Sequence, residues 1–164
     1  MTFDNSKTII GLRIKLFIAT VLFLAFIILT FVAKKINYPL LGMSDTVWTV
    51  ILAACYLIFV FLPMYLNYQY LYFSDDGENI VFRYFNAGIT GGKKNSVEIN
   101  KKAFSGYKVE KKLFSLSQSI ILYTKLRQGI AKYPPIHISA LTKEEKTKVI
   151  SILNTYAPRI KDES

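Results

Sequence analysis

Few residues of this 164-residue chain are of the types that carry out chemistry, and their spacing matches no common catalytic or metal-binding motif. His137 is the single histidine, with no cysteine or carboxylate cluster near it in the sequence. A metal site needs several ligands, so we interpret His137 as a surface residue on a strand. Ser115, Ser117 and Ser119 lack the sharp turn that exposes a nucleophilic serine. The sequence therefore predicts no catalytic residue, no metal and no cofactor.

A glycine-rich stretch from Gly88 to Lys94 has some features of a phosphate-binding loop. The established loop has four residues between its two glycines, then a lysine and a hydroxyl residue, and a helix follows. Here three residues separate Gly88 from Gly92, Lys94 occupies the hydroxyl position, and we expect a strand to follow. We interpret the stretch as a basic loop and predict no small-molecule substrate.

Three lysine pairs are the remaining candidates for a binding site: Lys93 with Lys94, Lys101 with Lys102, and Lys111 with Lys112. On one rim of a domain they would contact anionic lipid, which attracts basic segments near a membrane. The alternative is that they are solvated and protect edge strands from association. The chain has a net charge of +10, but its lysines are scattered without a nucleic-acid-binding motif, so we predict no nucleic-acid partner.

Two long apolar runs organise the first part of the chain. Leu16–Ala33 and Val47–Leu66 contain no charged residue, and as helices they are about 27 and 30 Å long, which matches the hydrocarbon core of a bilayer. We predict membrane-spanning helices over about 14–33 and 47–67, within an N-terminal segment and hairpin covering 1–66. The alternatives are two buried helices of a soluble core and, for the first run, a signal peptide. Cys55 lies inside the second run and cannot form an internal disulfide.

The connection between the runs, Lys34–Thr46, is short and contains Pro39 and Gly42, so the two helices should be antiparallel neighbours. The connection has two basic residues, against three before the first run and sixteen after residue 66. Basic residues favour the cytoplasmic side, so we predict a multi-pass protein of the cell's inner membrane with both termini in the cytoplasm. Aromatic side chains suit the membrane interface, and the predicted anchors are Tyr38, Trp48, Tyr65, Tyr68, Tyr70 and Tyr72.

The second half has the pattern of short strands followed by one helix. Strands are predicted at 68–73, 80–85, 96–100, 106–111, 118–125 and 130–138, with Pro134 and Pro135 restricting the last to an edge or an interruption. Ile136 and Ile138 should face inward. Thr142 and Glu145 form a capping box that starts a helix, and Pro158 ends it. We expect a domain over 68–157 and a polar tail over 158–164.

This order of elements resembles the bacterial pleckstrin-homology-like proteins that carry an N-terminal membrane hairpin. The resemblance covers about residues 10–157 and includes the hairpin sequence YLYFSDDGENIVFRY. It implies about seven bent antiparallel strands capped by the C-terminal helix, and a binding or scaffolding role. Lipid-binding members of the family use basic residues beside the first hairpin loop. The loop here, Asp75-Asp76-Gly77-Glu78, is acidic and would repel a phosphate.

The leading functional hypothesis is a non-enzymatic membrane protein whose cytoplasmic domain binds a protein partner or a second copy of itself, through an exposed strand edge or the groove between sheet and helix. One alternative is a domain that senses anionic lipid at the bilayer surface. The other is an accessory subunit of a transporter or enzyme complex, with Thr20, Thr30, Ala53 and Ala54 at helix–helix contacts.

Overall fold

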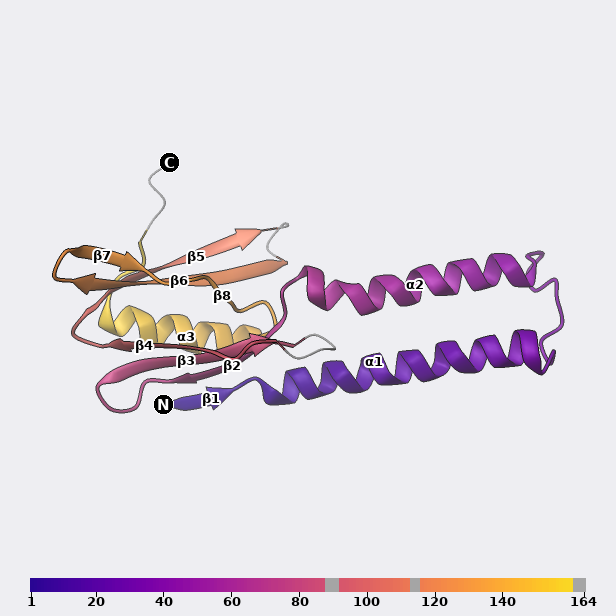
Figure 1. Ribbon diagram of the computed structural model, residues 1–164, viewed down its shortest axis with the longest axis horizontal. Helices are drawn as coiled ribbons and strands as arrows, with labels where there is room; N and C mark the ends of the chain where they lie inside the picture. Colours follow the sequence, from indigo (N-terminus) through magenta and orange to yellow (C-terminus); the bar gives the residue numbers. More distant parts are fainter. Residues whose placement is uncertain (88–91, 113–115, 161–164) are drawn as a thin grey trace. The chain divides into compact units, whose positions relative to one another are not determined.

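The computed structural model describes residues 1–87, 92–112 and 116–160, and the chain divides into two compact units (Figure 1). Residues 10–65 form a helical hairpin, and residues 1–9 together with 66–164 form the other unit, here called the β unit. The division differs from the predicted one, which assigned all of 1–66 to the hairpin segment. The first residues of the chain belong with the β unit because they pair with one of its strands.

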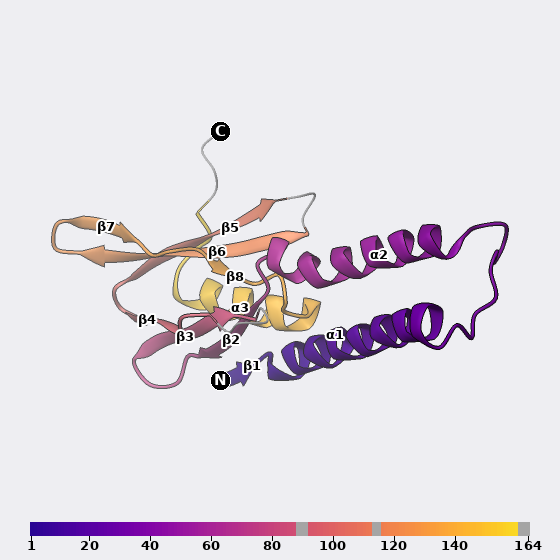
Figure 2. The ribbon, with the colours of Figure 1, turned by 45° about the vertical axis from the view of Figure 1, so that its right-hand side comes forward.

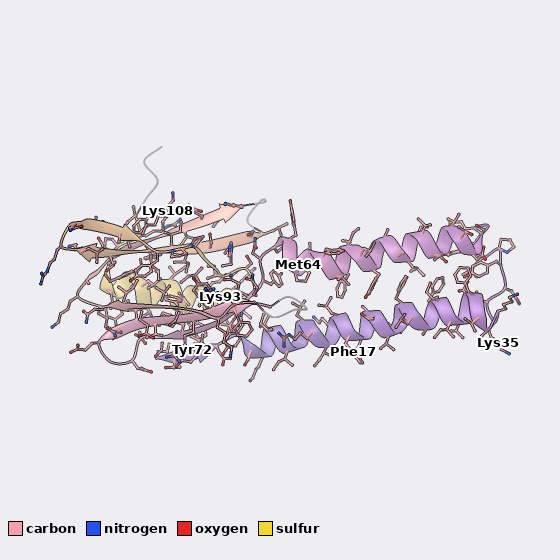
Figure 3. The ribbon with its side chains drawn as sticks, viewed as in Figure 1. Phe17, Lys35, Met64, Tyr72, Lys93 and Lys108 are labelled. Atoms are coloured by element: carbon pink, nitrogen blue, oxygen red, sulfur yellow. The ribbon has the colours of Figure 1, made fainter. Side chains whose placement is uncertain are left out.

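The hairpin consists of α1 (Ser6–Ile27), which continues as a π-helical turn (Ile28–Val32), and α2 (Asp45–Tyr65). The first helix begins eight residues before its predicted start, where the Asp4 carboxylate accepts a hydrogen bond from the Ser6 amide at 2.9 Å. Both helices are long and apolar enough to cross a membrane, and only 6% of each apolar window is buried. Phe17, for example, is 69% exposed (Figure 3). The core helices of a soluble protein would instead be mostly buried.

The first sheet contains four antiparallel strands in the order β1-β2-β3-β4. They are β1 (Thr2–Asp4), β2 (Gln69–Ser74), β3 (Asn79–Asn86) and β4 (Asn95–Asn100). The last three match predicted strands within one or two residues. The strand β1 is not among the predicted strands; it precedes the hairpin and pairs along the free side of β2, with Phe3 opposite Phe73.

The second sheet is centred on β6 (Ser117–Leu126), which pairs with three other strands. These are β5 (Phe104–Lys112), β7 (Gly129–Lys132) and β8 (Ile136–His137). Pro134 and Pro135 fall between β7 and β8, so the predicted interruption of the return strand is confirmed. Ile136 and Ile138 are fully buried, as predicted.

The C-terminal helix α3 (Lys143–Tyr156) lies between the two sheets in both Figure 1 and Figure 2. The predicted capping box is confirmed: the Glu145 amide donates to Thr142 Oγ1, and the Thr142 amide donates to Glu145 Oε2. Val149 and Leu153 on α3 are fully buried against the inner faces of both sheets. Antiparallel sheets and a C-terminal helix therefore share one hydrophobic core.

Candidate functional site

The two helices of the hairpin attach to neighbouring strands of one sheet. A single residue, Asn5, separates β1 from α1, and three residues separate α2 from β2. Asn5 is 1% exposed, and its side-chain amide donates to the Gln69 carbonyl at 3.0 Å. Its Oδ1 accepts from the Leu71 amide at 2.8 Å. Asn5 therefore joins the start of α1 to the strand that follows α2.

A second polar residue, Gln69, joins the first sheet to the second at this end of the β unit. Its Nε2 donates to Asn86 Oδ1 and its Oε1 accepts from the His137 amide, both at 3.0 Å. His137 is half-buried there, and its Nδ1 is buried without a hydrogen-bond partner among the described residues. Burial, with a smaller contribution from Lys112, lowers the pKa of the imidazole. His137 is thus part of the junction between the sheets, whereas the sequence analysis placed it on the surface.

Aromatic and basic side chains gather on the outer face of the first sheet. The strand register places Tyr70 opposite Phe85 and Tyr72 opposite Arg83. The first two rings stack with centroids 4.7 Å apart, and the Arg83 guanidinium lies 5.9 Å from the Tyr72 ring centroid. The Tyr70 hydroxyl donates to Asp4 Oδ2 at 3.2 Å, and burial raises the pKa of Tyr70. Arg83 also faces Glu98 on β4, at 3.8 Å.

A pocket of about 470 Å³ opens on this outer face. Strands β2 and β3 and the start of β4 supply its lining: Tyr70, Arg83, Tyr84, Phe85, Lys94, Asn95 and Ser96. The lining contains two cations, an aromatic platform and two small polar residues, but no acidic residue. Such a pocket suits an anionic group attached to an apolar or extended molecule.

The three predicted lysine pairs do not form one group. Lys93 and Lys94 precede β4, at the end of the first sheet where the helices attach. Lys111 and Lys112 end β5 next to His137, at the corresponding end of the second sheet. The pair between β4 and β5, Lys101 and Lys102, lies at the opposite end of both strands.

Lys101 already has partners within the β unit. Its Nζ donates to the carbonyl oxygens of Asp75 at 2.6 Å and Gly77 at 2.8 Å, and it lies 4.9 Å above the ring of Tyr156. It therefore ties the β2–β3 turn to the end of α3. Lys102, Lys111 and Lys112 are exposed, as are Lys93 and Lys94.

The acidic β2–β3 turn also makes contacts inside the β unit. Asp75 and Asp76 both accept hydrogen bonds from the Met1 amino group, and Thr2 donates to Asp76. These bonds lower the pKa of the Asp76 carboxyl to about 2. The turn thus holds β1 in place.

The predicted aromatic anchors divide between the two units. Tyr38, Trp48 and Tyr65 belong to the hairpin, where Tyr38 lies 3.2 Å from the Thr30 hydroxyl and Trp48 donates to the Leu40 carbonyl. The other three anchors belong to the β unit: Tyr68 packs against Ile9, Ala87 and Ala140, and Tyr70 and Tyr72 lie in β2.

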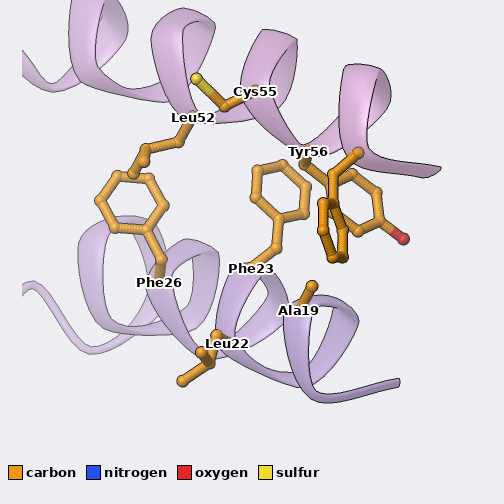
Figure 4. A pocket seen from close by; sticks show the side chains of 8 residues that line it. Ala19, Leu22, Phe23, Phe26, Leu52, Cys55 and Tyr56 are labelled. Atoms are coloured by element: carbon orange, nitrogen blue, oxygen red, sulfur yellow. The ribbon is translucent and has the colours of Figure 1, made fainter. Parts of the chain in front are cut away.

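An apolar groove of about 440 Å³ lies between α1 and α2 inside the hairpin (Figure 4). Its lining includes Phe23, Cys55 and Tyr56, and the rings of Phe23 and Tyr56 stack 4.8 Å apart. The Tyr56 hydroxyl lies 3.0 Å from the Thr20 hydroxyl, which also donates to the Leu16 carbonyl. Thr20 therefore contacts the other helix of its own hairpin.

Comparisons with protein-family models, curated proteins and solved structures found no match. No group of three or more histidine, cysteine or acidic side chains suited to a metal ion occurs in the described parts of the chain. The predicted glycine-rich loop falls largely on residues 88–91, and Ser115 on 113–115, which lie outside the described residues.

Proposed function

We propose that this chain is a membrane-anchored, non-enzymatic binding module. The helices α1 and α2 span the inner membrane, both termini lie in the cytoplasm, and the β unit binds a protein partner or a second copy of the chain. The β unit is proposed to have a pleckstrin-homology-like fold, with which two antiparallel sheets and a closing C-terminal helix are compatible.

One observation carries this proposal. The apolar hairpin is inserted between two hydrogen-bonded neighbours, β1 and β2, and Asn5 bonds across the two connections. With only one and three connecting residues, a membrane-spanning hairpin would keep the β unit close to the bilayer surface. Such an arrangement suits a module that presents a binding surface at the membrane.

Anionic lipid binding is a second candidate function. Lys93 and Lys94 lie at the end of the β unit where the helices attach, and Lys111 and Lys112 lie at the same end. Each lysine close to an anionic surface contributes about 1 kcal/mol of attraction. Removing these charges should weaken co-sedimentation with anionic vesicles if lipid is the ligand.

Cysteine labelling tests the anchoring, because the chain has a single native cysteine. In intact cells, a membrane-impermeant maleimide should leave Cys55 unlabelled. In a Cys55→Ala background, Ser44→Cys in the connection should be labelled from outside, and Gln128→Cys in the β6–β7 turn only after permeabilisation. Labelling of Gln128→Cys in intact cells would refute the orientation.

Cross-linking of the tagged full chain in native membranes tests the binding role. A specific protein or a second copy should co-purify with the chain in amounts comparable to the chain itself. If neither is recovered although Cys55 is protected from labelling, the chain is an anchored protein and the binding role is wrong.

A further inference from the structure

The strand β4 is an open edge of the first sheet. It pairs with β3 on one side and with no described strand on the other. The other edges are shorter or partly covered: β1 has three residues and β7 has four, and β5 is bridged at Tyr107 by Arg159 and Ile160. Natural proteins usually protect a long edge with a proline, a lysine or a covering segment. Within its six residues β4 has no proline and no lysine, and Glu98 is its one charged side chain.

The side chains of β4 alternate in the way that an added strand requires. Val97 and Ile99 point into the core and are 4% and 2% exposed, whereas Ser96 and Glu98 are exposed on the outer face. A strand that pairs with this edge would place alternate side chains on the same outer face. Those side chains would lie beside the aromatic pocket, whose lining includes Ser96.

The pocket supplies a charge preference for such a strand. Arg83 is opposite Ser96 in the register, and its side chain is 65% exposed. An added strand would lie two strand spacings from β3, or about 10 Å. The side chains of Arg83 and of a glutamate on the added strand are together long enough to meet across this distance. Lys94 lies at the start of the same edge. The contact of Arg83 with Glu98 is long, at 3.8 Å, and leaves the guanidinium open to a second carboxylate.

We propose that an extended, acidic segment of a protein partner binds by adding to β4, with a glutamate or aspartate side chain that pairs with Arg83 and Lys94 at the rim of the pocket. This inference rests on the proposed binding function and names the chemistry of the partner. A peptide is favoured over a lipid because only a peptide backbone offers the alternating donors and acceptors that match an open strand edge.

A library of random octapeptides, displayed on phage and selected against the full chain in nanodiscs of zwitterionic lipid, tests the proposal. We expect enriched sequences with β-branched residues at alternate positions and one acidic residue. The synthesised consensus peptide should bind about tenfold or more weakly to Arg83→Gln and to Lys94→Gln, as expected for the loss of a charge-assisted hydrogen bond. Lys102→Gln, at the other end of β4, is the matched control and should leave binding unchanged.

Backbone methylation distinguishes strand addition from binding in the pocket alone. Two versions of the consensus peptide are compared, one N-methylated at its odd-numbered residues and the other at its even-numbered residues. Because successive amides of a strand point to opposite sides, one version should lose binding and the other should retain it. Equal effects of methylation in the two versions would overturn the proposal. So would the absence of enriched acidic peptides, or affinity that ignores Arg83 and Lys94.

Two further outcomes separate this proposal from others. If anionic phospholipid in the nanodiscs binds in an Arg83- and Lys94-dependent manner while peptides do not, the pocket is a lipid site and the peptide proposal is wrong. If a partner is cross-linked in native membranes but attaches away from β4, the proposed function stands and this inference fails.

Discussion

His137 lies at the junction of the two sheets, where its Nδ1 is buried without a hydrogen-bond partner among the described residues. As the one histidine of the sequence, with no candidate partner near it, it is predicted to be a surface residue. In the structure, the His137 amide bonds to Gln69 of the other sheet, and the ring is half-buried beside Lys112. The sequence does not indicate a special role for Gln69 or Asn5 either, because a buried side-chain amide can be identified only from the groups that it bonds in the folded structure. Thr142 and Glu145 were predicted, because the capping-box signal is local.

The titration of His137 gives a pH prediction at this scale. Burial holds its pKa below the ordinary value of 6.5, so at pH values just below 6.5 the unfolded chain binds more protons than the folded chain. The free energy of unfolding should therefore fall as the pH falls below 6.5, until the folded-state pKa is passed. In thermal melts from pH 7.5 to 5.5, the melting temperature of the wild type should fall more steeply than that of His137→Gln. As His137 is the only histidine, equal slopes would contradict this prediction.

At the scale of elements, prediction succeeded where a segment carries its own periodicity. The strands β2 to β6 and the helix α3 were predicted within a few residues, because alternation, turn residues and caps are all local. The strand β1 was missed. Its three residues have no pattern of their own, and they form a strand because β2 offers them a free edge and Phe73 packs against Phe3.

The contacts of Lys101 join three elements: the β2–β3 turn, the β4–β5 turn and the end of α3. Lys101→Met should lower the free energy of unfolding by about 1–3 kcal/mol, because two carbonyl groups lose a charged donor. Lys102→Met is the matched control; it removes an exposed neighbour and should stay within about 0.5 kcal/mol of the wild type. Urea unfolding in detergent micelles, followed by circular dichroism, measures both. Equal effects would show that the Lys101 bonds contribute nothing.

At the scale of the whole molecule, the hairpin is an insertion into the β unit. The polypeptide forms one strand, leaves through α1 and α2, and returns to form the neighbouring strand. Residues 67–164 alone therefore lack part of the fold.

A pair of soluble proteins tests this insertion. Residues 1–9 joined by a flexible glycine–serine linker to 66–164 should fold with a cooperative melt. The fragment 67–164 should melt at a lower temperature or aggregate, because β2 loses its neighbour and Phe73 loses the packing of Phe3. Phe3→Asp in the linked protein should have a similar effect. Equal melting temperatures for the linked protein and the fragment would show that β1 is dispensable.

The sequence by itself determined the two long apolar helices, most of the strands, the capped C-terminal helix and the positive charge of the second half. These features depend on residues close together in the chain, through periodicity, hydropathy and local hydrogen bonding. Only the tertiary structure decided that residues 2–4 complete the first sheet, that His137 is half-buried at a junction, and that one of the three lysine pairs lies at the opposite end of the β unit from the other two. It also decided that Arg83, Lys94 and the stacked rings of Tyr70 and Phe85 share one pocket beside an open edge. Each of these depends on strand order and register, which bring together residues that no local pattern connects.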